Sequence, residues 1–454
     1  MEKPNVIIML MDNLGYGDVG CYGSNRHRTP NIDRLASQGM RLTDFYSTSG
    51  VCTPSRASLM TGCYPRRVNM HCGGRGTSVL MPIDPKGLHP DEVTLADVLR
   101  DRGYATACVG KWHLGDQPPF LPTRHGFDTF FGVPYSEDMV PGDAHPGWPP
   151  LPLMRQEEVV EAPVDRDFLT RRYTEESIRF IRENADRPFF LYLPHAMPGS
   201  CDEPFASSAF RGRSRNGIYG DCVEELDWSA GAIMDTLDEL NLANNTLIIW
   251  TSDNGAVEHD PPQGSNAPLN GWGYSTTEGG QRVPCIIRWP ERIPAGEVQS
   301  KVTTMMDFLP TIRHITDGQL PVAREIDGHQ IMDLLTGEPE ASSPYDSTGF
   351  FYYHMQQLQA VRAGRWKLYL PLDRKITALS LSHAESVPAE ARLYDLRSDI
   401  GEENEVSTEH PKMVERLMGL AEKARRDLGD MGREGVNQRR AGWVDEPVPQ
   451  IMHE

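Results

Sequence analysis

Near its N-terminus the chain reads Val6-Ile7-Ile8-Met9-Leu10-Met11-Asp12-Asn13, an unbroken apolar run followed by two polar residues. A run without alternation is typical of a strand that is buried on both faces, in a sheet covered by helices. In such sheets ligands bind beyond the carboxyl ends of the strands, which is where Asp12 and Asn13 fall. The stretch therefore predicts both a layered α/β fold and a polar site at one edge of the sheet.

The rest of the chain repeats this alternation of strands and helices. Strands are predicted at 105–109, 189–193, 246–251 and 283–289, and helices at 94–102, 165–184 and 221–240. Strands that alternate with helices indicate a mostly parallel, doubly wound sheet sandwiched by helices. The segment 118–163 is rich in proline and glycine, and we expect a long loop there.

The pattern changes after about residue 345. Strands are predicted at 350–354, 358–361 and 366–370, with a turn at 363–365, and a helix at 411–428. This is the pattern of a small antiparallel sheet with one helix. We therefore expect two domains, an N-terminal one over residues 1–345 and a C-terminal α+β subdomain over residues 346–454.

The amino-acid composition argues against two kinds of partner, nucleic acid and membrane. The 454 residues carry a formal net charge of −19, whereas nucleic acid is bound by basic faces. No apolar run approaches the ~18 residues that span a bilayer, so we expect no membrane partner. The first residues lack a signal peptide, which predicts a cytoplasmic protein or one whose leader is absent from this sequence. The eight cysteines show no C-x-x-C spacing, a weak sign of a reducing compartment.

Polar residues follow several of the predicted strands. Asp12, Lys111, His195 and Asp253 each come directly or closely after a strand, so they should meet at one edge of the sheet. The pairs Asp12-Asn13 and Asp253-Asn254 offer carboxylate and amide oxygens, the ligands of hard cations, which favours Ca²⁺ first and Mg²⁺ second. The alternative is that both pairs are ordinary turn formers.

A second signal is the run Cys52-Thr53-Pro54-Ser55-Arg56. Pro54 and the small residues after it predict the start of a helix, whose positive end favours an anion. Cys52 could be an inert buried cysteine or a thiolate activated by the helix and Arg56. An anionic substrate would need local cations against the overall charge, and Arg56, Arg66, Arg67 and Lys111 are available.

These motifs together resemble the type I, formylglycine-dependent sulfatases, in the arylsulfatase-like branch of the alkaline phosphatase superfamily. The resemblance rests on Cys52–Arg56 and on the segments 12–18 (DNLGYGD), 29–33 (TPNID), 110–115 (GKWHLG), 132–136 (GVPYS), 252–255 (SDNG), 278–284 (EGGQRVP), 360–370 and 393–397.

The resemblance implies that Cys52 is oxidised to formylglycine by a formylglycine-generating or maturase enzyme. Its hydrated form, a gem-diol, would attack the sulfur of a sulfate ester and later expel sulfate to regenerate the aldehyde. The divalent cation would be held by Asp12, Asn13, Asp253, Asn254 and the modified Cys52. Arg56 and Lys111 would hold the gem-diol and neutralise charge, His113 would take its second proton, and Ser136 would lie near the sulfate.

Three positions depart from the family pattern. Asn13 stands where aspartate is usual, Gly199 where a histidine is usual, and Gly273 where a lysine is usual. The missing histidine and lysine normally clamp the sulfate, and glycines in their place should open space for a bulky substrate. We hypothesise that His195 replaces the proton donor, with a core histidine as the alternative. Further candidates to fill the gap are His259 and Arg282.

The leading hypothesis is a sulfatase that hydrolyses a sulfate ester, with sulfated carbohydrates as the expected substrates. Loop aromatics that could stack on sugar rings are His145, Trp148, Trp272 and Tyr274. Two alternatives stay open, namely a phosphate or phosphonate ester hydrolase on the same fold and a non-catalytic binding relative.

Overall fold

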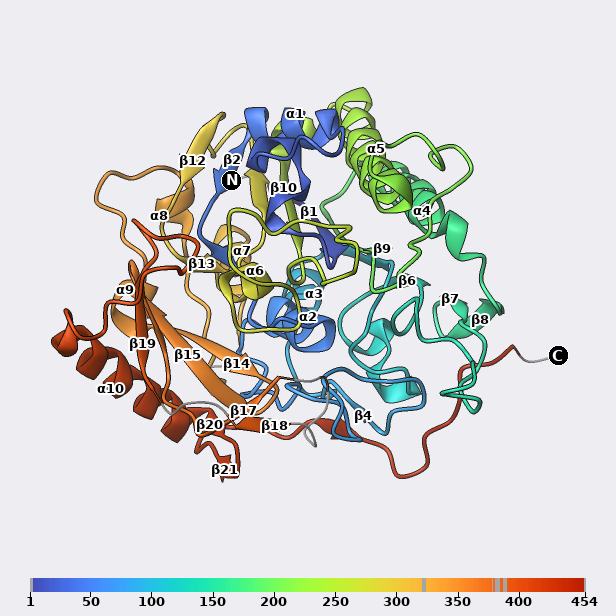
Figure 1. Ribbon diagram of the computed structural model, residues 1–454. Helices are drawn as coiled ribbons and strands as arrows, with labels where there is room; N and C mark the ends of the chain where they lie inside the picture. Colours follow the sequence, from blue (N-terminus) through green and yellow to red (C-terminus); the bar gives the residue numbers. More distant parts are fainter. Residues whose placement is uncertain (1–2, 321–323, 378, 380–383, 387–389, 453–454) are drawn as a thin grey trace.

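The computed structural model describes residues 3–320, 324–377, 379, 384–386 and 390–452. Its centre is a ten-stranded sheet with the order β12-β2-β11-β10-β1-β9-β5-β6-β7-β8 (Figure 1). The strands are, in that order, Glu297–Gln299, Met40–Leu42, Cys285–Arg288, Thr246–Ser252, Asn5–Asp12, Phe189–Pro198, Ala105–Val109, Thr129–Gly132, Leu153–Arg155 and Glu158–Glu161. From β10 to β6 all neighbours are parallel, which confirms the predicted fold class.

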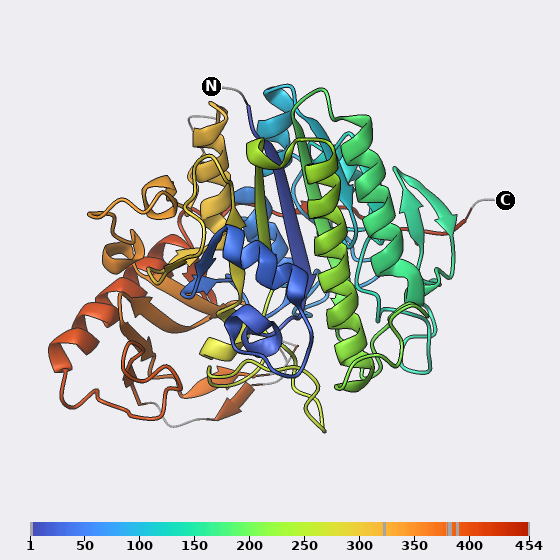
Figure 2. The same cartoon turned by 90° about the horizontal axis from the view of Figure 1, so that it is seen from above.

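Strand β1 is buried on both faces because helices cover the sheet from both sides (Figures 1 and 2). Ile7, Met9 and Met11 join the core under α1 (Pro30–Gln38), α4 (Leu169–Glu183) and α5 (Gly217–Glu239). Their neighbours Val6, Ile8 and Leu10 join the second core, under α2 (Cys52–Thr61), α3 (Leu95–Asp101) and α7 (Phe308–Ile315). Side chains alternate across a strand, so both sets must be apolar and the run is continuous.

One prediction about the sheet was wrong, and another is refined by the structure. The segment 118–163 is not one long loop, because it contains β6, β7 and β8 at one flank of the sheet. These strands have only three or four residues each, too few for a hydrophobic period to stand out among prolines and glycines. The predicted strand 283–289 exists as β11, which runs antiparallel to β10.

The C-terminal part contains the predicted antiparallel sheet, with strands β14 (Phe350–His354), β15 (Gln357–Ala363), β16 (Trp366–Tyr369) and β19 (Arg392–Asp395). Helix α10 (Pro411–Asp427) packs on it (Figure 1). Tyr46 and Tyr64 from the N-terminal part enter the same apolar cluster. The domain boundary near residue 345 stays a prediction.

Smaller α-helices and strands also occur in the described chain. They are β3 (Phe45–Tyr46), β4 (Lys86–Gly87), α6 (Glu278–Gln281), β13 (Thr303–Thr304), α8 (Met332–Leu335), α9 (Tyr345–Thr348), β17 (Arg374–Ile376), β18 (Ala384–Ser386), β20 (Gly429–Asp430), β21 (Arg433–Glu434) and β22 (Gly442–Trp443). Among the described residues, no helix combines the length and apolar character needed to cross a membrane.

Candidate active site

Cys52 is the first residue of helix α2, and its side chain is buried. Val51 before it is extended, and Pro54 lies in the first turn, where a missing N–H costs nothing. The helix ends at Gly62, which takes a left-handed conformation and donates its N–H to the carbonyl of Ser58. These local signals place residue 52 at the positive end of a buried helix.

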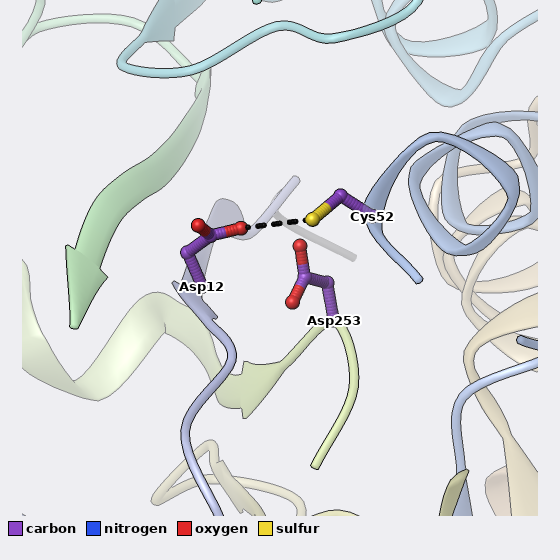
Figure 3. Close-up of side chains that lie close together, drawn as sticks. All are labelled: Asp12, Cys52 and Asp253. Carbon is purple, nitrogen blue, oxygen red and sulfur yellow. Dashed lines mark hydrogen bonds between the residues drawn. The ribbon is translucent and has the colours of Figure 1, made fainter. Parts of the chain in front are cut away.

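The ends of two parallel strands bring carboxylates to Cys52 (Figure 3). Asp12 ends β1 and Asp253 directly follows β10, its neighbour in the sheet. The Sγ atom of Cys52 lies 3.3 Å from Oδ1 of Asp12, and possible ligand atoms of the three residues lie within 4.8 Å of one another. The sequence prediction that strand ends converge on Cys52 is met for these two aspartates.

Two buried cations hold this acidic group together. Lys111 Nζ lies 2.8 Å from Oδ1 of Asp12 and 3.5 Å from Sγ of Cys52. Arg56 donates to Asp12 at 2.9 Å and to Asp253 at 2.8 Å. Although burial acts to raise the pKa of Asp12, the charges of Lys111 and Arg56 hold it below its usual range. Burial and the Asp12 carboxylate raise the pKa of Asp253 to about 7.

The donor set around Asp12 fits a hard cation. The Oδ1 atom of Asn13 lies 3.9 Å from Sγ of Cys52 and accepts a hydrogen bond from Asn254 at 2.6 Å. The Oδ1 atom of Asn254 is buried and has no hydrogen-bond partner within the described chain. Carboxylate and amide oxygens with an unsatisfied buried acceptor are what Ca²⁺ or Mg²⁺ would complete. The residues fit both ions, and the geometry does not choose between them.

The environment of Cys52 does not favour a thiolate. Burial, followed by the charges of Asp12 and Asp253, raises the pKa of the Cys52 thiol well above its ordinary value. The charges of Lys111 and Arg56 lower this pKa, but by less than burial and the two carboxylates raise it. The hypothesis of an activated thiolate nucleophile is therefore disfavoured, because reactive cysteines lie in electropositive surroundings.

His113 lies in a left-handed conformation within the loop after β5 (φ 61°). Thr53, the neighbour of Cys52, donates its hydroxyl to the carbonyl of His113 at 3.0 Å. The Nε2 atom lies 2.9 Å from the carbonyl oxygen of Leu80, which can only accept. The neutral ring therefore carries its proton on Nε2 and keeps a lone pair on Nδ1. Burial and the charges of Lys111 and Arg56 lower the pKa of His113 well below its usual value.

Ser136 connects Lys111 to a buried carboxyl group that the sequence analysis missed. Lys111 Nζ lies 2.7 Å from Oγ of Ser136, which donates to Oε2 of Glu137 at 2.9 Å. Burial raises the pKa of Glu137 to about 8. Its Oε1 atom accepts the backbone N–H of Ser200 at 3.0 Å. The loop 132–136 thus reaches the site as the family pattern implies, and it brings Glu137 with it.

Gly199 and Gly273 do not open space, contrary to the sequence-based expectation. A Cβ atom at Gly199 would collide with Oε1 of Glu137, and the backbone there has a φ of 78°. A Cβ atom at Gly273 would lie 2.5 Å from the carbonyl oxygen of Gly255. At both positions, neighbouring protein atoms therefore occupy the space that a larger side chain would need.

The structure does not bring His195 to Cys52. Its Nε2 atom lies 3.1 Å from Oγ of Ser229 on α5, and its ring lies beside Tyr173 on α4. The pleat explains this, because Leu191 and Leu193 of β9 face α4 and α5, whereas Phe190 and Tyr192 face the α2 layer. Burial alone lowers the pKa of His195 to about 3. The core-histidine alternative fits these contacts, and counting the pleat in the sequence could have indicated it.

Other predicted cations also lie elsewhere. Arg282 donates to the carbonyl of Thr43 and to Asp44, both at 2.7 Å, and no contact found for it reaches Cys52. Arg66 donates to the carbonyl of Leu428, and Arg67 pairs with Asp327 and Asp427, beyond the far end of α2. His259 lies 3.0 Å from Asp202. Of the predicted cluster, only Arg56 and Lys111 meet at the site.

The sheet and its site, a helix N-terminus and strand-end carboxylates around one residue, define an alkaline phosphatase-like hydrolase. A family model described as Sulfatase matches residues 4–318, and one described as the C-terminal region of aryl-sulfatase matches residues 346–445. The chain belongs to the sulfatase family and is a sulfuric ester hydrolase. The hypothesis of a non-catalytic relative is thereby set aside.

Relatives with named activities cover most of the chain. Steryl-sulfatase of Homo sapiens is 38% identical over 435 residues, covering 80% of this chain and 74% of the relative. N-acetylgalactosamine-6-sulfatase of Canis lupus familiaris is 38% identical over 383 residues, covering 81% and 72%. A chain solved in work on the metabolism of glycosaminoglycans by Bacteroides thetaiotaomicron has a TM-score of 0.79 and 29% identity, covering 94% of this chain and 100% of that one.

Proposed function

We propose that this protein hydrolyses a sulfate ester of a carbohydrate, with formylglycine formed from Cys52 and a bound divalent cation. The observation that carries the proposal is the placement of Cys52 at the start of α2, between Asp12 and Lys111. The encoded thiol is a poor nucleophile there, since its pKa is raised. Formylglycine would supply a hydrated aldehyde whose hydroxyl attacks sulfur.

The cation would be held by Asp12, Asn13, Asp253, Asn254 and the modified residue 52. When bound, it supplies positive charge to the sulfate oxygens and lowers the pKa of the attacking hydroxyl. Because Lys111 and Arg56 keep Asp12 ionised, that carboxylate is ready to bind the ion. Ca²⁺ is the first choice and Mg²⁺ the second, because Ca²⁺ takes many oxygen ligands from protein side chains, whereas Mg²⁺ usually keeps several waters.

The surrounding side chains have separate tasks. Lys111, within reach of both residue 52 and Ser136, holds the nucleophile and neutralises charge that develops on the sulfate. Arg56 orients the carboxylates of Asp12 and Asp253 through its ion pairs with both. His113 accepts a proton at Nδ1, the nitrogen that has no partner within the described chain. Ser136 would bind the sulfate by turning its hydroxyl proton from Glu137 toward a sulfate oxygen.

The carbohydrate substrate is supported by two comparisons, the relative named for N-acetylgalactosamine 6-sulfate and the solved chain from glycosaminoglycan metabolism. The partly exposed hydroxyl-bearing residues Ser200 and Tyr274, which contact each other near Asn13, would suit the polar groups of a sugar. A formylglycine-generating enzyme or maturase would be needed as a partner during production.

The test combines mass and turnover. Protein made with and without a formylglycine-generating enzyme is digested with trypsin, and the mass of the peptide Leu42–Arg56 is measured. Both samples and Cys52→Ala are then assayed on sulfated mono- and oligosaccharides, 4-nitrophenyl sulfate and 4-nitrophenyl phosphate. We expect sulfate ester turnover only in protein with formylglycine. Full activity with an unmodified thiol would overturn the mechanism, and faster hydrolysis of the phosphate would favour the phosphate ester alternative.

A further inference from the structure

Three chain segments meet near Gly199 and Gly273, the two glycines that depart from the family pattern. Ser200 follows β9, Tyr274 lies in the loop before α6, and Glu137 follows the loop after β6. The hydroxyl of Tyr274 lies 2.8 Å from Oγ of Ser200. Glu137 holds the backbone N–H of Ser200 at 3.0 Å. None of these contacts belongs to the roles assigned above.

The hydroxyl pair is tied directly to the proposed cation ligands. Asn13 donates from Nδ2 to Oγ of Ser200 at 2.8 Å, while its Oδ1 atom faces Cys52 at 3.9 Å. Ser200 and Tyr274 are both partly exposed, whereas Glu137 is fully buried. The pair therefore belongs to residues that are partly open to solvent, and Glu137 lies buried next to Ser200.

The hydrogen bonds leave one donor free. Ser200 has a single hydroxyl proton and already accepts from Asn13, so that it can donate to the Tyr274 oxygen. With that orientation the Tyr274 O–H has no acceptor in the pair and can donate to a bound molecule. A hydroxyl with a satisfied oxygen and a free proton is suited to a developing negative charge.

The backbone holds Tyr274 beside the nucleophile segment. Its N–H donates to the carbonyl of Gly50 at 2.8 Å, two residues before Cys52. A Cβ atom at Gly50 would lie 3.2 Å from the nitrogen of Tyr274 and closer still to Ser275, so glycine is needed for this approach. Tyr274 itself has a φ of 65°, a strained conformation for an aromatic residue. Such strain persists where the surroundings determine it, often at functional sites.

We propose that the Tyr274 hydroxyl, oriented by Ser200, is the donor to the leaving oxygen of the sulfate ester, with Glu137 as a positioning residue. This inference rests on the proposed function. As the sulfur–oxygen ester bond breaks, its electron pair stays on the leaving oxygen, which takes the phenol proton. Water returns a proton to the phenolate after the alcohol leaves.

The experiment measures how the rate depends on the leaving group. Wild-type protein with formylglycine and Tyr274→Phe are assayed on phenyl sulfates whose phenols range from 4-nitrophenol to unsubstituted phenol. A leaving group of high pKa depends more on a proton donor than one of low pKa. In the variant, kcat/KM should therefore fall about 100-fold for phenyl sulfate and less than about threefold for 4-nitrophenyl sulfate. The plot of log kcat/KM against leaving-group pKa should become steeper.

Two further variants make the result decisive. Tyr173→Phe removes a buried hydroxyl that has no hydrogen-bond partner within the described chain, and it should keep the wild-type slope. Ser200→Ala leaves the phenol in place and should steepen the slope less than Tyr274→Phe. An equal loss for all esters, or no loss, would overturn this inference alone. A wild-type protein that carries formylglycine and hydrolyses neither these esters nor the sulfated mono- and oligosaccharides would overturn the proposed function, and the inference with it.

Discussion

The Nζ atom of Lys111 lies 3.5 Å from Sγ of Cys52, and the same ammonium group contacts both oxygens of Asp12 at 2.8 and 2.9 Å. A buried cation between the nucleophile position and a carboxylate can hold the first and keep the second ionised. Lys111→Met should therefore lower kcat by about 10²- to 10³-fold, which steady-state hydrolysis of a sulfate ester measures.

Lys86 offers a matched control for this change. It is also a buried lysine, but its Nζ lies 3.9 Å from Sγ of Cys72 and bonds to the carbonyl of Cys72 at 2.8 Å. Lys86→Met should leave kcat within about threefold of wild type, although it removes a buried charge as well. Equal losses of kcat in both variants would contradict the role of Lys111.

Asn13 carries one negative charge less than the aspartate usual in the family. Asn13→Asp should lower the Kd for Ca²⁺ about tenfold, or ~1.4 kcal/mol, because ligand charge raises the affinity for a hard cation. Isothermal titration of metal-depleted protein measures it. Asn69→Asp is the control, since Asn69 shares the left-handed backbone of Asn13, with φ of 56° against 58°. Unchanged or weaker binding in Asn13→Asp would speak against this cation site.

Two features require glycine at position 199, the close approach of the Glu137 side chain and the left-handed backbone conformation. Gly199→Ala should lower the free energy of unfolding by about 1–3 kcal/mol more than Gly212→Ala. Gly212 has nearly the same φ, 77° against 78°, but nothing lies within 4 Å of an added Cβ atom. Urea denaturation of both variants gives the difference. Equal losses would show that only the backbone conformation matters at Gly199.

Asp116 should make stability depend on pH. Burial raises its pKa from 3.8 to about 7, so the folded state binds a proton that the unfolded state releases between these values. The contribution is fully present below about pH 4 and is lost as the pH rises to 7. The wild type should thus exceed Asp116→Asn in stability by roughly 2–4 kcal/mol more at pH 4 than at pH 8. Urea denaturation at several pH values measures this, with the exposed Asp143→Asn as the control.

Substitution of the two predicted catalytic histidines, His113 and His195, should affect different quantities. His113→Ala should lower kcat at least about 100-fold, since a proton acceptor is lost. His195→Ala should leave kcat within about threefold and lower the free energy of unfolding by about 1–3 kcal/mol, because a buried ring is removed and Ser229 loses one of its two hydrogen-bond partners in the core. Kinetics and urea denaturation of both variants test this. A large loss of kcat in His195→Ala would restore its catalytic role.

Much of the nucleophile side could be predicted from the sequence. Apolar runs that end in Asp12 and in Asp253 belong to neighbouring parallel strands, and parallel strands end at the same edge of the sheet. Cys52 and Arg56 are one helical turn apart, so both lie at the start of α2. Local pattern and sheet chemistry were sufficient for these residues.

The opposite side could not be predicted, for two physical reasons. Glu137, Ser200 and Tyr274 are ordinary residue types whose roles depend on contacts across 63 and 74 positions of chain. His195 and Arg282 have residue types that suit catalysis, but the pleat of β9 and the pairing with Asp44 turn them elsewhere. Chemistry-bearing residue types alone do not show which face a side chain takes.

The amino-acid sequence alone determined the layered sheet, a helix that starts near Pro54 and the oxygen-bearing side chains at the strand ends, because hydrophobic periodicity and local turn chemistry act over a few residues. Tertiary structure alone decided that Glu137 fills the room beside Gly199 and that Ser200 and Tyr274 meet. Those contacts join loops far apart in the chain, and only the packing of those loops around α2 and β9 brings them within hydrogen-bond distance.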